Sequence, residues 1–187
     1  MRKLLNIIRL FIWLSLLTGL IYPLLITGVA QLFWRFQAGG SLLNVQGVMV
    51  GSHLLAQNFT GERYFWPRPS SQEFDPMRSG GSNLGPMSSE LKRLVEERAK
   101  RLKRTPDDIP SELLFASGSG LDPHIGPAAA YYQLERILRA RGLADDPLAR
   151  IALRELIEES VEPRSFGFLG TTRINVLELN YKLDGRL

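Results

Sequence analysis

The chain of 187 residues contains no cysteine. It therefore cannot form disulfides, use a thiolate nucleophile or bind a metal through thiolates. Histidine is almost as scarce, since His53 and His124 are the two present. No histidine pair stands at helical spacing and no run of carboxylates resembles a metal loop. The sequence thus predicts neither a disulfide framework nor a resident metal, and it offers two histidines as a base for a nucleophile.

Acidic residues are absent from the first 61 positions, and the first carboxylate is Glu62. The same region carries Arg2, Lys3, Arg9 and Arg35. Four of the 23 basic residues lie there and all 19 acidic residues lie beyond, so the rest of the chain is formally neutral. The sequence pI of 9.6 therefore reflects the N-terminal segment and gives no support to nucleic-acid binding.

Residues 10–34 form an uninterrupted run without a formal charge. As a helix this run would be roughly 37 Å long, enough to cross a hydrocarbon core of about 30 Å. A cleaved signal peptide is the competing interpretation, and Gly28, Val29 and Ala30 could form its cleavage site. Its apolar region would be only ~7–15 residues long, however. The run therefore predicts an uncleaved membrane helix, in which a kink at Pro23 would be tolerated.

The position of the basic residues predicts the orientation of this helix. Three cations precede it, and positive charge favours the cytoplasmic side. We therefore expect residues 1–9 in the cytoplasm, residues 10–34 in the membrane, and residues 35–187 outside the cytoplasm as one domain. Small residues in the helix, namely Gly19, Gly28 and Ala30, would permit close approach to a partner helix.

In the segment after the helix, the order of expected strands, helix starts and helix ends predicts an α+β domain. Residues 37–41 read as a flexible exit, and residues 42–50 as a strand or strand pair. Helices are expected after Ser88, from Gly126 and Pro127 to Gly142, and from Asp146 and Pro147 to about Ser160. The last of these is expected to run through Ile151, Leu153, Leu156 and Ile157. Residues 174–181 are expected to form a strand that completes the core.

A serine hydrolase is the first catalytic alternative. Ser117, Ser119, Asp122 and His124 lie within eight residues of one another. A nucleophile and its base are aimed by a scaffold, and residues so close in sequence cannot be aimed independently. Asp122, which precedes Pro123, is more simply interpreted as a cap that accepts backbone N–H groups.

Two glycine–serine segments, residues 79–86 and 117–120, raise the question of phosphate binding. Glycines let backbone amides converge on an anion. Neither segment has a phosphate-loop or dinucleotide fingerprint, and no lysine follows. Residues 79–81 resemble the start of the signature of ABC transporters, but Ser82 departs from it. We favour turns that let two pieces of backbone approach closely. The weak candidates for cofactor binding are Ser79, Gly80, Gly81, Ser82 and Asn83.

Five segments together resemble one family, the KdpC family of the Kdp potassium-transporting ATPase. They are residues 51–59, 64–70, 79–86, 116–125 and 174–180, and their order and spacing make chance agreement improbable. Departures are modest: Ala56 stands where a glycine is common, and Gly126 where a serine is common. The resemblance implies one membrane helix and an extracytoplasmic domain in the bacterial cytoplasmic membrane. It implies two partner proteins, a channel-like subunit that selects potassium and a P-type subunit that hydrolyses ATP.

The resemblance implies an accessory protein that is not itself an enzyme, with two candidate roles. One is a catalytic chaperone that raises the affinity of the pump subunit for ATP. The other is an assembly and stabilising subunit that caps the potassium entrance. ATP is cytoplasmic, and the nine residues expected in the cytoplasm, residues 1–9, are too few to build a nucleotide pocket. We therefore expect no cofactor bound directly, with ATP and potassium handled by the complex, and any effect on ATP to be allosteric.

Several residues together supply aromatic rings, a guanidinium group and glycine backbone that a partner could approach closely. This composition is typical of interface centres, so these residues are candidates for the interface with the two partner proteins. Internal packing is the alternative for each of them. Beyond the small residues of the helix, the candidates are Tyr64, Phe65, Trp66, Arg68, Ser117, Gly118, Ser119, Gly120 and Asp122. Membrane lipid is expected around the helix, and nucleic acid is not expected as a partner.

Overall fold

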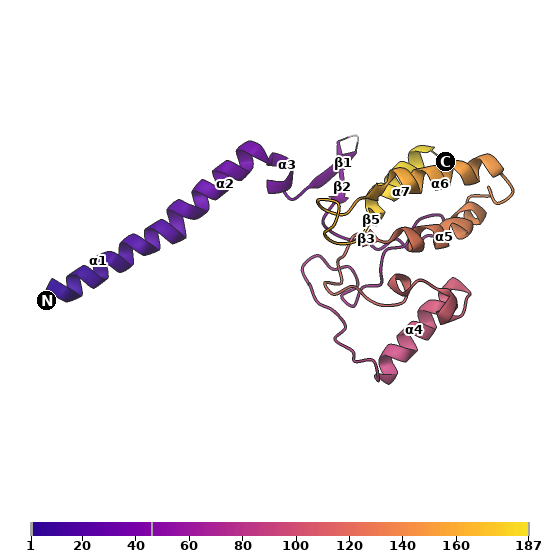
Figure 1. Ribbon diagram of the computed structural model, residues 1–187, viewed down its shortest axis with the longest axis horizontal. Coiled ribbons are helices and arrows are strands. Elements are labelled where there is room, and N and C mark those ends of the chain that lie inside the picture. The colour runs from indigo at the N-terminus through magenta and orange to yellow at the C-terminus, as the bar shows by residue number, and fades with distance from the viewer. Residues whose placement is uncertain (1, 46, 187) are drawn as a thin grey trace. The chain divides into compact units, whose positions relative to one another are not determined.

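A long N-terminal helical segment dominates the first part of the computed structural model, which describes residues 2–45 and 47–186 (Figure 1). It consists of α1 (Arg2–Leu16), the π-helical turn η1 (Leu17–Ile21) and α2 (Tyr22–Phe33). Within the described residues, this 32-residue segment is the one helix long and apolar enough to cross a membrane, and its most apolar part has no buried residue. The predicted helix is therefore present, although it begins before residue 10 and ends before Trp34.

A π-helical turn precedes Pro23 in the helix. Proline has no N–H to donate and crowds the preceding turn. The backbone N–H of Tyr22 bonds to the carbonyl of Leu17, five residues back, so the turn before the proline is widened. A single wide turn of this kind is a known way to fit a proline or a functional bend into a long helix.

The exit from the helix is more ordered than expected. A short helix, α3 (Arg35–Ala38), occupies part of the predicted flexible segment, so that prediction was wrong for its first two residues. β1 (Leu42–Val45) and β2 (Val48–Ser52) then form an antiparallel pair, which confirms the strand pair. By its contacts the chain divides here into two units, one that ends at Ser52 and one that begins at His53.

The unit from His53 onward contains four helices in its described residues: α4 (Ser89–Leu102), α5 (Pro127–Ala140), α6 (Pro147–Glu159) and α7 (Val176–Arg186). Single 3-10 turns, η2 (Pro106–Asp108) and η3 (Ser111–Leu113), join α4 to the next segment. The predicted caps are present, because Ser88 accepts from the N–H of Leu91 and Asp146 from that of Leu148. The expected starts of α4 and α6 are thereby confirmed, and α5 begins as expected at Pro127, after Gly126.

A small antiparallel sheet completes this unit, with the order β3 (His124–Ile125), β5 (Arg173–Asn175) and β4 (Val161–Glu162). The prediction of a strand over residues 174–181 is confirmed for residues 174 and 175 and was wrong for residues 176–181, which form part of α7. The strand ends at Asn175, whose side-chain oxygen accepts from the N–H groups of Leu177 and Glu178 and so begins α7. The buried residues Val176, Leu179 and Leu183 then recur at helical rather than strand spacing.

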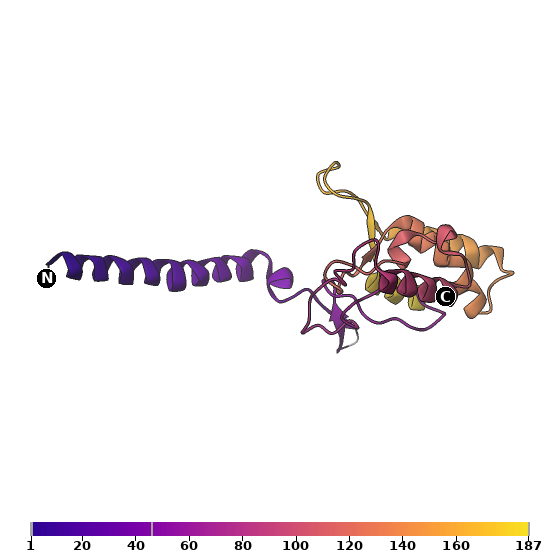
Figure 2. The same ribbon diagram turned by 90° about the horizontal axis from the view of Figure 1, so that it is seen from below.

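The core lies where α5, α6 and α7 meet the small sheet (Figures 1 and 2). Leu153, Leu156 and Ile157 of α6 are fully buried, and Ile151 is exposed. Ile151 stands two positions from Leu153, half a turn away on a helix, and therefore lies on the outer face. The largest fully buried side chains are Phe65, Ile125, Ile137, Leu138, Leu153, Leu156, Ile157, Ile174, Leu179 and Leu183.

Candidate functional site

The segment around Phe65 and Trp66 is held in the core by two amide side chains. Asn180 of α7 accepts from the N–H of Phe65 at 2.8 Å and donates to its carbonyl at 2.9 Å. Gln133 of α5 does the same for Trp66, at 2.8 and 3.1 Å. Each amide replaces the partner that a neighbouring strand would supply. Phe65 is fully buried and Trp66 is 7% exposed, so their aromatic bulk serves internal packing.

Two arginines lie against the Trp66 ring. The guanidinium carbons of Arg101 and Arg136 are 4.0 and 3.8 Å from its centroid, within cation–π range. Arg136 also donates to the carbonyls of Glu62 and Tyr64. Burial lowers the pKa of Arg136 to about 10, because the charged form is desolvated. This cation therefore fixes the backbone that carries Tyr64 and Trp66.

The two glycine–serine segments pack against each other. The N–H of Gly80 donates to the carbonyl of Ser119 at 2.8 Å. A Cβ on Gly81 would stand 3.1 Å from the carbonyl oxygen of Gly118, and one on Gly120 would stand 3.0 Å from that of Gly80. Gly120 also has φ +70. The interpretation as close-approach turns is confirmed for these glycines, and the Gly80 amide is committed to a protein oxygen.

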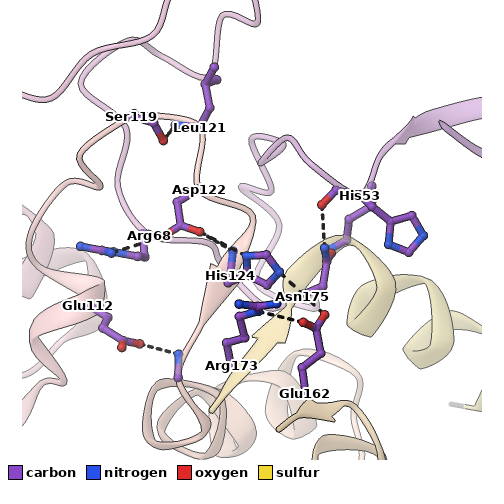
Figure 3. A network of polar contacts seen from close by, with 12 residues as sticks. His53, Arg68, Glu112, Ser119, Leu121, Asp122, His124, Glu162, Arg173 and Asn175 are labelled. Carbon is purple, nitrogen blue, oxygen red and sulfur yellow. Dashed lines mark hydrogen bonds and ion pairs between the residues drawn. The ribbon is translucent and has the colours of Figure 1, made fainter. Parts of the chain in front are cut away.

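A chain of charged side chains follows this junction on one face of the unit (Figure 3). Arg68 pairs with Asp122 at 3.3 Å, and the imidazole of His124 lies 3.4 Å from Asp122 and 3.7 Å from Glu162. Glu162 continues the series to Arg173 at 2.8 Å. An open groove of about 260 Å³ is lined by Arg68, Asp122, His124 and Arg173 of this series, and by Glu112, Gly126, Thr171 and Thr172 among others.

Asp122 has the role expected from its position before a proline. Its Oδ1 accepts from the backbone N–H of His124 at 3.0 Å. Burial by itself raises the pKa of the Asp122 carboxyl, but the bonds to His124 and the charge of Arg68 favour the ionised form, and the net effect lowers the pKa. Asp122 is thus an ionised cap that joins Arg68 to His124.

The serines are not arranged around His124 as in a hydrolase. Ser119 accepts from the N–H of Leu121 at 3.1 Å, and Ser117 is 2% exposed. The partners of His124 in the network are the carboxylates of Asp122 and Glu162, and Ser119 lies beyond Asp122 in Figure 3. Within the described residues 2–45 and 47–186, neither Ser117 nor Ser119 forms a described hydrogen bond with His124. The geometry gives the hydrolase alternative no support.

From His53 onward, the segments that carry the family resemblance converge in this unit. Leu121 accepts from Ala56, Pro69 accepts from Ser117, and Pro123 accepts from Val176, each through backbone atoms at 2.9 to 3.1 Å. The side chain of Asn175 donates to the carbonyl of His53 at 2.9 Å. His53 also lies 2.5 Å from Glu178. The segments thus form one hydrogen-bonded junction.

Local sequence patterns did not predict the roles of several residues of this junction. Gln133 and Asn180 are polar residues within otherwise apolar, buried helix faces, and that contrast is the signal that could have identified them. Glu162 and Arg173 are opposite each other on neighbouring strands, a pairing that no local pattern reveals. Among the described residues no group of three or more histidine and carboxylate side chains could hold a metal ion.

The helix residues proposed for partner contact are accessible within their own unit. Gly19 and Gly28 are exposed and Ala30 is half-buried. A Cβ built on either glycine would meet nothing within 4 Å. Gly19 lies in the π-helical turn and Gly28 in α2, so both remain open to a neighbouring helix.

Comparison with known proteins identifies close relatives. A family model described as "KdpC: K+-transporting ATPase, c chain" matches residues 4–185. A potassium-transporting ATPase KdpC subunit of Leptospira interrogans is 46% identical over 180 residues, which cover 95% of this chain and 90% of the relative. The KdpC subunit of Geobacter sulfurreducens is 45% identical and covers 98% of both chains. That of Acidobacterium capsulatum is 49% identical and covers 89% of both.

Proposed function

The chain belongs to the KdpC family of K⁺-transporting ATPases, and from that membership we propose that it assembles and stabilises a potassium-uptake complex as a non-catalytic, membrane-anchored subunit. The observation that carries this proposal is the joint presence of one exposed apolar helix, Arg2–Phe33, and a separate unit whose family-defining segments form one packed junction. A helix anchors the protein, and a rigid unit presents a surface to its partners.

The proposed topology follows from charge. Residues 1–9 lie in the cytoplasm, residues 10–34 lie within the membrane-spanning helix, and residues 35–187 lie outside the cytoplasm, with the anchor in the bacterial inner membrane. Arg2, Lys3 and Arg9 precede the apolar run and no acid opposes them before Glu62, so the N-terminus is retained inside. The helix extends through the basic N-terminal residues, whose long side chains can reach the interface from there.

Two partner proteins are proposed, the potassium-selecting channel-like subunit and the ATP-hydrolysing P-type subunit. Helix contacts to them would use the small residues Gly19, Gly28 and Ala30. Contacts of the exported unit would use the half-buried Arg68 and Tyr64 rather than the buried Phe65 and Trp66.

An effect on ATP affinity would have to be allosteric in this arrangement. Nine cytoplasmic residues offer no pocket for a nucleotide. The glycine–serine segment of residues 79–83 stands in the exported unit, and its Gly80 amide already bonds to Ser119. Coupling between sites requires that the two ligands or subunits favour the same state of the complex. A chaperone-like role is therefore compatible with the proposal only through the partner subunits.

Reporter fusions test the topology. A reporter joined after residue 40 should be active when it requires an extracytoplasmic location and inactive when it requires the cytoplasm. The matched control replaces Arg2, Lys3 and Arg9 by glutamine, which removes the positive charge that retains the N-terminus and should lower the exported signal. Strong cytoplasmic activity of the wild-type fusion would contradict the topology and reopen direct nucleotide contact at residues 79–83.

Copurification tests the assembly role. A tagged protein should recover two large membrane subunits, and its deletion should abolish high-affinity potassium uptake. A protein that purifies alone while uptake persists without it would contradict the proposal.

A further inference from the structure

The loop that joins β4 to β5 presents three large apolar side chains to its surroundings. Phe166 is 88% exposed, Phe168 is 71% exposed and Leu169 is 51% exposed. In Figure 2 this loop stands clear of the helices of its unit. Single exposed apolar residues are ordinary, but three within four consecutive positions at a protruding tip form a patch of the kind that marks a binding surface.

The tip has a fixed backbone conformation. Ser165 and Leu169 exchange two backbone hydrogen bonds, at 3.0 and 2.9 Å, and the N–H of Gly167 bonds to the carbonyl of Arg164 at 3.0 Å. Phe166 has φ +54, a conformation that is strained for a bulky residue. The backbone thus holds this ring outward at a conformational cost. A loop ordered before binding loses less entropy when it docks.

The charges near the tip have one sign. Residues 163–172 contain no acid, and Arg164 is their one charged residue. At the base of the loop Arg173 is paired with Glu162 at 2.8 Å. An aromatic tip with a flanking arginine matches the composition of interface centres. Its complement is an apolar recess with carboxylates at the rim.

We propose that the tip formed by residues 164–169 docks into an apolar, carboxylate-rimmed recess on the extracytoplasmic face of a membrane-embedded partner subunit of the K⁺-transporting ATPase. The inference rests on the proposed function, and on its topology for the side of the membrane. Two observations favour a protein recess over lipid. A fluid interface accepts aromatic side chains from a loop of any shape, whereas this backbone is fixed and strained at Phe166. The base of the loop also continues into the groove at Thr171, Thr172 and Arg173, so a specific polar surface adjoins the loop at its base.

The first experiment removes the rings within the assembled complex. In the double variant Phe166→Asn/Phe168→Ser the asparagine tolerates positive φ, so the loop keeps its shape while the apolar tip is lost. The variant protein should melt like wild type but dissociate from the large subunits about thirty- to a hundred-fold more readily. The matched control is Met77→Ser/Met87→Ser, at positions 90% and 96% exposed, which should leave recovery unchanged. Equal recovery for the loop variant would overturn the inference.

The second experiment distinguishes a protein recess from lipid. Because the sequence has no cysteine, Leu169→Cys gives a single labelling site for a fluorescent probe. In nanodiscs that hold this protein alone, iodide should quench the probe freely. In the assembled complex, quenching should fall about five-fold or more, because the recess excludes water and the iodide dissolved in it. Protection in lipid alone, or free quenching in the complex, would each overturn the inference. Failure of the wild-type protein to recover the large subunits would instead contradict the proposed function.

Discussion

The side chain of Asn180 pairs with both backbone polar groups of Phe65, 115 residues away in the chain. Both residues are buried, at 2% and 0% exposure. The amide thus acts like one residue of a neighbouring strand, because it accepts one hydrogen bond and donates the other. Gln133 and Trp66 repeat the arrangement one residue further on. A segment without regular secondary structure can therefore cross the core with its backbone groups satisfied.

Asn180→Leu should destabilise the unit by about 2–4 kcal/mol, because it leaves the N–H and the carbonyl of Phe65 buried without partners. Leucine has a similar shape, so little of the loss would come from packing. Denaturant unfolding of the detergent-solubilised protein, followed by circular dichroism and tryptophan fluorescence, measures the change. The control Asn58→Leu, at an exposed position, should shift stability by less than about 0.5 kcal/mol. Equal effects of the two variants would show that the amide pairing contributes little.

Gly81→Val and Gly120→Val should each lower the unfolding free energy by about 1–3 kcal/mol. At Gly81 the new side chain would press on the Gly118 carbonyl, and at Gly120 it would also have to adopt φ +70. Gly85→Val is the control, since a Cβ there meets nothing within 4 Å. Thermal melting of the three variants gives the comparison. If the Gly81 and Gly120 variants melt like wild type yet lose potassium uptake, these segments are functional surfaces rather than structural turns.

Asp122 should make the unit sensitive to acid. Its folded-state pKa lies below the ordinary value, since bonds from His124 and the charge of Arg68 outweigh the cost of burial. A depressed pKa contributes stability that is present above the unfolded-state pKa, about 3.9, and is lost as pH falls through the folded-state pKa. Asp122→Asn keeps an acceptor for the His124 N–H but cannot titrate. Its stability should therefore fall less steeply than that of wild type below about pH 4, as measured by unfolding at a series of pH values. If the curves of stability against pH for wild type and variant are parallel, Asp122 is not the cause of the acid sensitivity.

Arg68→Ala should weaken association with the partner subunits while lowering the stability of the protein by less than about 1 kcal/mol, because a half-buried ion pair of this kind contributes little to folding. Arg78→Ala is a matched control, since Arg78 also pairs with an aspartate, Asp75, at 3.3 Å but is far more exposed. Recovery of the large subunits with each tagged variant measures association. Equal recovery of the two variants would remove Arg68 from the interface candidates, and a large loss of stability would reassign it to the core.

Local signals in the sequence were sufficient for the elements that begin and end with them. The uncharged run predicts the long N-terminal helix, and the proline, aspartate and glycine around Pro127, Asp146 and Gly142 set the starts of α5 and α6 and the end of α5. These predictions were sound because helix propensity, capping and lipid-spanning length depend on residues close together in the chain. The family could likewise be identified from sequence, because its five segments are read in order along the chain.

The tertiary structure alone decided the rest. Residues 174–181 have an apolar run that suits a strand or a helix, and the Asn175 cap together with burial against α6 made residues 176–186 a helix. Phe65 and Trp66 have the composition of interface residues, yet amides from α5 and α7 hold them in the core. Phe166 and Phe168 have ordinary core composition, yet they stand outside it. Whether an aromatic residue packs inside or faces a partner depends on contacts between segments far apart in the sequence, and no local pattern contains those contacts.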